Sequence, residues 1–304
     1  MRRLIVVLIV LMEGWGFTVN GQQQAMFTQY MFNQLAINPA YAGVHEGISA
    51  SLLWREQWIG FEGAPSTQTF SIHSPISFRP ISMGGMIMRD KIGITNHIGA
   101  NFSYAYRIKF GNSRLSFGLQ ASINNFQANY AAIGTLDPTL LDSDVNVSLP
   151  NFGSGILWHS DRYYLGFTVP QIINQQLDPK NPASDSELVR HYFIIGGCLF
   201  PLAENVLLKP NFLFKSVQGA PAQLDINMNM LLQHVLWLGI SYRQLESFSM
   251  LVQLQVSPQF QIGYSMDFLT DDYLRKVNSG SSHEIMINYI FELPQTKILT
   301  PRYF

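Results

Sequence analysis

The sequence predicts an all-β protein, an antiparallel transmembrane β-barrel of about 14 strands in the outer membrane, with a short non-strand segment at its N-terminus. Three observations predict this fold. Hydrophobic residues recur with period two in segment after segment from residue 47 on. Only 13% of the residues are charged, which is about half the usual share for a soluble domain. The connections between the segments are short at one end of the expected barrel and long at the other.

Residues 1–21 have the tripartite pattern of a signal peptide. Two arginines precede the apolar run Leu4–Met12, and small and polar residues follow it. A run of this length would cross only about 14 Å of a hydrocarbon core of about 30 Å, so it is too short for a membrane anchor. We therefore expect export, with cleavage just before Gln22. No cysteine lies near that position, which excludes a lipoprotein anchor, and the one cysteine, Cys198, cannot form an intramolecular disulfide.

The rest of the chain is apolar overall without any long apolar run. Hydrophobic residues make up 47% of the sequence, yet no stretch after residue 21 approaches the 18 or so uninterrupted apolar residues of a membrane-spanning helix. Inside lipid only helices and closed barrels satisfy every backbone hydrogen bond, so an apolar exterior built here must come from strands. The net charge of −1 gives no footprint for nucleic acid, and the expected surroundings are outer-membrane lipid.

About 14 segments alternate between apolar and polar residues. In the clearest, Ser247–Ser257, Phe248, Met250 and Val252 alternate with serine, leucine and glutamine. A second alternating run follows after a few residues around Pro258, which predicts a hairpin. The strands are expected near residues 47–55, 67–74, 82–90, 95–108, 114–124, 151–159, 162–170, 190–200, 205–217, 221–232, 235–243, 247–256, 259–268 and 284–291.

A soluble antiparallel sandwich also alternates, because one of its faces is buried. Its other face should carry many Lys and Glu residues, whereas the polar positions here are mostly Ser, Gly, Asn and Gln, as in a barrel interior. If the N-terminus is periplasmic, the short turns are periplasmic and fall near 111–113, 160–161, 201–204, 233–234 and 258. The long external loops then cover 125–150, 172–189 and 269–282.

Four places in the expected barrel carry particular predictions. The last places Ile285, Ile287, Tyr289 and Phe291 on the lipid face, which suits the barrel seam and the interfacial aromatic girdle. The strand near 190–200 is apolar on both faces, and the region 74–90 fits more than one register. Pro210 lacks a donor for its ladder, so a bulge is expected there.

By the same alternation, six charged side chains of mixed sign face the lumen. They serve either as a selectivity filter or as ion pairs that fill the interior and hold a plug, and the second reading is favoured because about 25 exported residues precede the first strand. These side chains are Arg107, Lys209, Lys215, Asp225, Arg243 and Asp267.

The segment before the first strand is not itself a strand. The spacing of Met26, Tyr30 and Gln34 allows one short helix, and Asn38-Pro39 followed by Gly43 marks a turn. It is a plug, a periplasmic segment or a plain linker. The expected organisation is a signal peptide at 1–21, this segment at 22–46, the barrel at 47–293 and a tail at 294–304.

No catalytic or metal-binding arrangement is found in the sequence. Gly153-Ser154-Gly155 lacks the glycine two residues before the serine and lies in a strand, unlike a nucleophile elbow. The seven histidines are scattered without metal-ligand spacing. Asp142–Asn146 opens like a calcium loop but lacks its sixth-position Gly and its twelfth-position Glu. We expect a protein that is not an enzyme and holds no cofactor or metal.

Four motifs in order resemble the PorP/SprF family of outer-membrane proteins. The resemblance runs from the signal peptide to the last residue, and the ordered set is more specific than any one motif. The motifs are Phe27-Thr28-Gln29-Tyr30 with Asn38-Pro39-Ala40-Tyr41-Ala42-Gly43, then Trp54-Arg55-Glu56-Gln57-Trp58, then Ala64-Pro65-Ser66-Thr67-Gln68-Thr69, and finally Pro301-Arg302-Tyr303-Phe304.

The resemblance implies a component of the type IX secretion system of gliding and related bacteria. Members of the family assist secretion or surface attachment of large adhesins that carry a C-terminal targeting domain, so the implied partners are such an adhesin and other type IX secretion or gliding components. A passive channel or a transporter of hydrophobic solutes is the alternative function. The family has no catalytic residues to carry over, and the motif residues are candidates for partner or plug contacts: Phe27, Tyr30, Asn38, Pro39, Tyr41, Trp54, Arg55 and Trp58.

Overall fold

The computed structural model describes residues 24–76, 79–130, 144–178, 187–244, 246–270 and 280–292. The predicted signal peptide and tail, with the Pro301–Phe304 motif, lie outside these residues. So do the middle parts of the three predicted long loops and the start of the calcium-like segment. No helix among the described residues is long and apolar enough to span a membrane.

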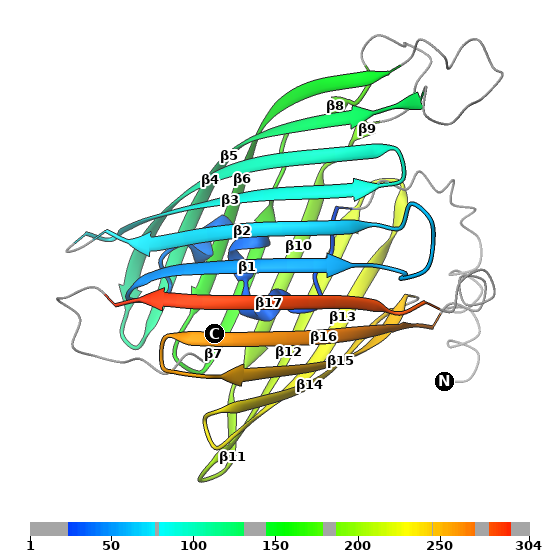
Figure 1. Cartoon of the computed structure of the whole chain (residues 1–304). Helices are drawn as coiled ribbons and strands as arrows, with labels where there is room; N and C mark the ends of the chain where they lie inside the picture. The colour runs from blue at the N-terminus through cyan, green and yellow to red at the C-terminus, as the bar shows by residue number, and fades with distance from the viewer. Residues whose placement is uncertain are drawn as a thin grey trace, which may run out of the picture.

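The strands form one closed antiparallel barrel, which confirms the predicted fold class (Figure 1). Its strands are β1 (Ile48–Glu56), β2 (Ser66–Pro75), β3 (Ile81–Ile92), β4 (Thr95–Phe110), β5 (Ser113–Ala128), β6 (Val145–His159), β7 (Tyr163–Val169), β10 (His191–Cys198), β11 (Phe200–Ala203), β12 (Val206–Val217), β13 (Ala220–Leu232), β14 (Leu236–Arg243), β15 (Ser247–Gln255), β16 (Phe260–Leu269) and β17 (Ser282–Phe291). β10 and β11 pair with β12 in the same register and form one barrel strand, so the barrel has 14 strands. The seam is the pairing of β1 with β17.

The connections divide between the two ends of the barrel as predicted. We call the end reached by β1 the loop end, because it carries the connections after β1, β5, β7 and β16. The end where β1 starts is the turn end, and it carries short turns such as those after β4 and β6. The predicted loop at 125–150 is shorter than expected because β5 and β6 extend into it. The loop after β7 contains a small hairpin of β8 (Gln175–Gln176) and β9 (Glu187–Leu188).

Side chains alternate between the lumen and the outer surface as the period-two pattern predicted. In β15, Ser249 and Gln253 are buried in the interior while Met250 and Val252 are exposed on the outside. In the ambiguous strand β10, Phe193 and Ile195 are buried, between outward neighbours. The apolar outer surface therefore belongs to side chains that face lipid.

Two local predictions are wrong. Pro210 lies opposite Met228 in an unshifted register, so β12 has no bulge at this position. Instead the neighbouring strand is interrupted at Leu199, between β10 and β11, near the point where the proline offers no N–H donor. The predicted single helix before the barrel is also absent. That segment forms three 3₁₀ turns, η1 (Tyr30–Phe32), η2 (Gln34–Ala36) and η3 (Pro39–Tyr41), because lumenal groups bind its backbone and side chains as described below.

Arginine at the lipid-facing position Val252 should destabilise the barrel by about 2–4 kcal/mol if this residue lies near the bilayer midplane. The matched lumenal change, Ser265→Ala, removes a buried hydroxyl without a hydrogen-bond partner and should be nearly silent. Urea unfolding of both variants in lipid vesicles measures the difference. Equal effects on the two faces would contradict this assignment of lipid and lumen.

Candidate functional site

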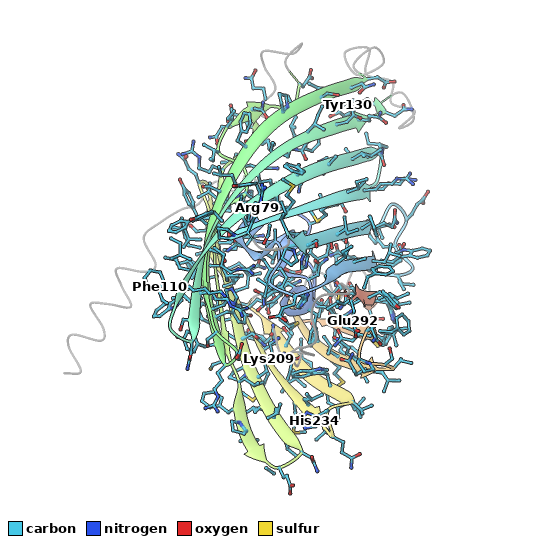
Figure 2. The ribbon with its side chains drawn as sticks, turned by 90° about the vertical axis from the view of Figure 1, so that its left-hand side faces the viewer. Arg79, Phe110, Tyr130, Lys209, His234 and Glu292 are labelled. Atoms are coloured by element: carbon cyan, nitrogen blue, oxygen red, sulfur yellow. The ribbon has the colours of Figure 1, made fainter. Side chains whose placement is uncertain are left out.

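The described residues before β1, 24–46, lie inside the barrel and are called the plug here. Viewed from the turn end, their ribbon is enclosed by the ring of strands (Figure 2). The plug enters at the loop end, where Thr28 contacts Asp267 and Glu284, and leaves at the turn end, where Gly43 contacts His73. Its apolar side chains, among them Met31 and Leu35, form the largest buried cluster of the protein's described part.

At the loop end the plug is bound by three buried charged side chains of the barrel. Arg55 of β1 pairs with Asp267 of β16 at 2.6 Å and with Glu284 of β17 at 3.2 Å. Thr28 inserts between them. Its hydroxyl donates to Asp267 at 2.9 Å and accepts a hydrogen bond from Arg55 Nη1 at 2.9 Å. The plug side chain thus completes an ion network that is almost without solvent exposure.

Glu284 also binds the backbone of the plug. Its two carboxylate oxygens accept hydrogen bonds from the N–H groups of Thr28 and Gln29, at 2.9 and 2.8 Å. Hydrogen bonds to a charged group are about twice as strong as neutral ones. This carboxylate fixes the position of the plug along the barrel axis, because two consecutive N–H groups converge on it.

A second buried ion network lies beside the first. Arg243 pairs with Asp225 and with Glu246, each at 3.0 Å, and donates to the carbonyl of Phe27 at 3.4 Å. Burial alone would raise the pKa of Glu246, but the adjacent Arg243 guanidinium outweighs this and lowers that pKa. The plug therefore contacts both networks within a few residues.

The middle of the plug is held by polar groups and by rings. Asn227 donates to the hydroxyl of Tyr30 at 3.1 Å. Burial, followed by the nearby Asp225 carboxylate, raises the pKa of Tyr30 well above its usual value, so this phenol stays neutral. Lys209 lies 5.0 Å from the ring centre of Phe32, which contacts Trp237 edge to face.

The segment Asn38–Tyr41 packs against glycines of the barrel wall. A Cβ atom on Gly118 would lie 2.2 Å from Ala40 N, and one on Gly155 would lie 2.1 Å from Asn38 Oδ1. Asn38 also caps η3 by accepting from Ala40 N–H at 2.9 Å, and it donates to the carbonyl of Ile156 at 3.0 Å. Glycine is unfavourable for a strand itself, and at these two positions it makes room for the plug, whose backbone approaches Gly118 and whose Asn38 side chain approaches Gly155.

At the turn end the plug is fixed by an aromatic and histidine cluster. The ring of Tyr41 lies edge to face on His73 at 5.5 Å. The N–H of Gly43 donates to His73 Nδ1 at 3.0 Å, and Arg107 donates to the carbonyl of Ala42 at 3.2 Å. The plug is therefore attached at both ends and in the middle.

The structure brings together six of the eight motif residues and separates two. Phe27, Tyr30, Asn38, Pro39 and Tyr41 lie in the plug, and Arg55 binds it. Trp54 points to the outer surface with 59% exposure, and Trp58 lies in the loop after β1, where its backbone N–H donates to Ser282 Oγ at 3.2 Å.

All six predicted inward charges have lumenal side chains, and most of them touch the plug or its ion networks: Arg107, Lys209, Lys215, Asp225, Arg243 and Asp267. Sequence reasoning missed Glu284 and the two glycines, Gly118 and Gly155. Alternation along β17 could have identified Glu284 as inward, because it lies two positions before the buried Met286. The strand sequences alone do not indicate that these two glycines contact the plug.

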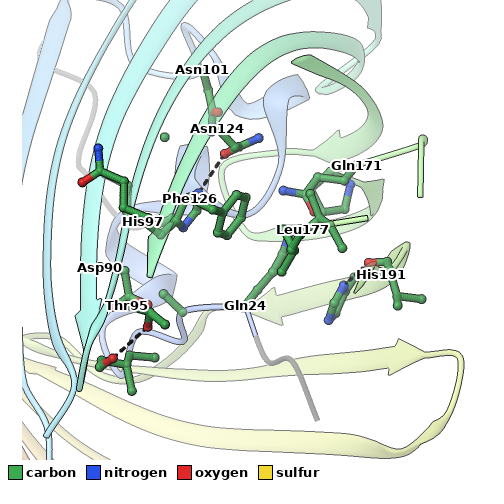
Figure 3. A pocket seen from close by; sticks show the side chains of 18 of the residues that line it. Gln24, Asp90, Thr95, His97, Asn101, Asn124, Phe126, Gln171, Leu177 and His191 are labelled. Atoms are coloured by element: carbon green, nitrogen blue, oxygen red, sulfur yellow. Dashed lines mark hydrogen bonds between the residues drawn. The ribbon is translucent and has the colours of Figure 1, made fainter. Parts of the chain in front are cut away.

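A cavity of about 320 Å³, called the vestibule here, lies between the plug and the loop end (Figure 3). Its floor is formed by the plug residues Ala25, Phe27 and Ala36, and its walls come from β3, β4, β5 and the loop after β7. The rings of His97 and Phe126 stack in its wall with centroids 4.1 Å apart. Among the described residues no group of three His, Cys, Asp or Glu side chains could hold a metal ion.

Comparisons with solved structures place the chain among outer-membrane barrels. A Pseudomonas aeruginosa FadL homologue is similar with a TM-score of 0.53 and 12% identity, over 85% of this chain and 94% of that one. Acinetobacter baumannii Omp33 matches at 0.48 with 8% identity over 82% and 100% of the chains, and the P. putida toluene transporter TodX at 0.47 with 9% identity over 84% and 93%. The chain matches no curated protein. The family described as type IX secretion system membrane protein PorP/SprF matches residues 19–289.

Proposed function

Since that match covers most of its length, the chain belongs to the PorP/SprF family of type IX secretion system membrane proteins, and we propose that it assists secretion or surface attachment of a large adhesin. In this proposal the protein is not an enzyme. It binds the C-terminal targeting domain of the adhesin at the loop end of the barrel, and other secretion or gliding components are further partners.

The fixed plug is the observation that carries the proposal. A passive channel needs an open lumen, whereas this lumen is filled by a segment held by two buried ion networks and by close contacts to wall glycines. A barrel closed in this way is suited to binding a partner at its rim. The rim at the loop end offers exposed apolar side chains for such contacts, including Ile59, Phe61 and Ile173.

The vestibule is the observation that favours the rival function, a transporter of hydrophobic solutes. Its walls combine apolar side chains such as Met86 and Leu177 with polar ones, as ligand cavities do. Transport through the barrel would require the plug to move, since Phe27 and Ala36 close the vestibule from below. The binding of a secreted partner requires no such movement.

Deleting the gene should abolish surface display of one large adhesin while leaving general protein secretion intact. Complementation with Trp58→Ala should fail to restore display if the loop after β1 contacts the partner, and Tyr41→Ala should fail if the turn-end attachment of the plug is needed. Limited proteolysis of intact cells, followed by identification of the released fragments, measures display.

Tyr106→Ala provides the control, because this tyrosine is 44% exposed on the outer face of β4, away from the lumen that holds the plug. A deletion strain that displays all its surface proteins and instead loses uptake of a small solute would replace this proposal with the transporter.

A further inference from the structure

The vestibule is closed by the plug on one side, so an occupant enters and leaves through the loop end. Its volume of about 320 Å³ lies at the lower end of the range of ligand cavities, about 300–1,000 Å³. The plug floor and the wall strands belong to one well-packed unit, which makes the cavity a preformed feature rather than a gap between loops.

Six of the residues that line this cavity carry a carboxamide side chain. They come from four separate parts of the chain, and Figure 3 labels Gln24, Asn101, Asn124 and Gln171 around the same space. Each carboxamide offers two N–H donors and one acceptor oxygen with two lone pairs. The donors can pair with the C=O group of a peptide bond, and the oxygen can pair with its N–H group. The six are Gln24 from the plug, Asn101 from β4, Gln120, Asn124 and Gln127 from β5, and Gln171 from the loop after β7.

Most of their hydrogen-bonding capacity is unused. Gln24 and Asn101 make no side-chain hydrogen bond with the rest of the described structure, and Gln120 makes only a 3.5 Å contact to the carbonyl of Pro170. Gln171 is 8% exposed and its Oε1 is buried with no partner. Asn124 is the exception, since its Oδ1 contacts His97 Nε2 at 3.1 Å. Buried or half-buried amides normally have hydrogen-bond partners. The carboxamides of this wall therefore have donors and acceptors left to bind a ligand.

The charge of the lining excludes anionic ligands. Among the described residues no Lys or Arg lines the vestibule, and the carboxylate side chains there are Asp90 and Asp178. Between the carboxamides the wall is apolar, with Met86 and Met88 on β3 and Leu177 near the hairpin. The complementary ligand is therefore uncharged, carries amide donors and acceptors, and has apolar groups between them.

We propose that the vestibule binds an extended, uncharged peptide segment, whose main-chain N–H and C=O groups pair with the carboxamides while its apolar side chains contact Met86, Met88 and Leu177. A helical segment is not complementary to these carboxamides, because its main-chain N–H and C=O groups are already bonded to each other. This inference rests on the proposed function, in which the segment belongs to the secreted partner.

Titration calorimetry of the full-length protein in lipid nanodiscs tests the site with defined probes, and the absence of detergent keeps alkyl chains out of the cavity. The first probe is the blocked peptide acetyl-Val-Ser-Val-Ser-Val-amide. The second is the same peptide with N-methyl groups on its main-chain nitrogens, which removes the donors and keeps the apolar side chains. We expect the first to bind and the second to bind at least tenfold more weakly.

The double variant Asn101→Leu with Gln171→Met removes two carboxamides from the wall. Neither side chain donates or accepts a hydrogen bond within the part of the chain that the structure describes, so the variant should assemble like the wild type. It should bind the unmethylated peptide about tenfold more weakly and should no longer distinguish the two probes. Asn96→Leu is the matched control, because Asn96 lies on the outer face of the same strand as Asn101 and bonds Arg89. It should bind like the wild type.

Two results would overturn the inference. One is no detectable binding of the unmethylated peptide by the assembled wild-type protein. The other is binding of the neutral oligosaccharide maltohexaose in place of the peptide, which would make the vestibule a glycan site. Either result leaves the adhesin proposal standing if the deletion strain still loses display. Conversely, if the deletion strain displays the adhesin normally while the purified protein binds the peptide, the vestibule is a peptide site that does not serve adhesin export.

Discussion

Replacing Arg55 by methionine should destabilise the barrel by about 3–5 kcal/mol. The substitution removes the one cation that pairs with both Asp267 and Glu284 and leaves two carboxylates together in the lumen, where they are 3% and 0% exposed. Breaking a buried ion pair from one side is costly because the remaining charge is left without compensation. The urea midpoint of unfolding in detergent, together with the gel shift on heating, measures the loss.

Two further variants show whether the effect comes from uncompensated charge. The triple variant Arg55→Met, Asp267→Asn, Glu284→Gln removes the charges on both sides and should recover most of the stability. Arg89→Met is the matched control, since Arg89 bonds Asn96 at the exposed surface, and it should change the free energy of unfolding by less than about 0.5 kcal/mol. If Arg55→Met unfolds at the wild-type midpoint, the loop-end network does not stabilise the barrel.

Replacing Gly118 by leucine should expel the plug and open the lumen. A Cβ atom there would lie 2.2 Å from Ala40 N and 2.6 Å from its Cα, and backbone atoms cannot move aside as a flexible side chain can. The strand itself accepts leucine, so the barrel should remain assembled while the plug loses its central attachment. Planar-bilayer recordings should change from no resolved conductance in the wild type to steady ion conductance in the variant.

Gly85→Leu is the control for a glycine that the plug does not touch. Its Cβ would meet only Asn101 O, at the ordinary contact distance of 3.5 Å, and the residue belongs to the outward set of β3. This variant should remain closed. If Gly118→Leu is as closed as the wild type, the fit between the glycines and the plug does not keep the lumen shut.

The sequence was sufficient for the barrel because period-two alternation is a local property that each strand carries by itself. It predicted the strand positions, the lumenal charges and the division between short turns and long loops.

The shape of the plug could not be read in the same way. Its 3₁₀ turns have no amphipathic period, because each turn is fixed by lumenal groups that are distant in sequence, such as Glu284 for Thr28 and Gly155 for Asn38. For the same reason the sequence grouped Trp54 and Trp58 with the plug residues, although one faces outward and the other lies in a loop. A motif that is continuous in the chain is divided here between lumen, lipid and rim.

The pairing of Arg55 with Glu284 also bears on how the barrel closes. These two residues lie directly opposite each other across the β1–β17 seam, and the plug that binds both immediately precedes β1 in the chain. A slip of one residue at the seam would turn every side chain of one strand to the other face and expose one of these charges to lipid. The plug would then lose either the guanidinium or the carboxylate that Thr28 requires. Correct alignment of the first and last strands and seating of the plug therefore depend on each other, because Thr28 reaches both charged groups only in the native register.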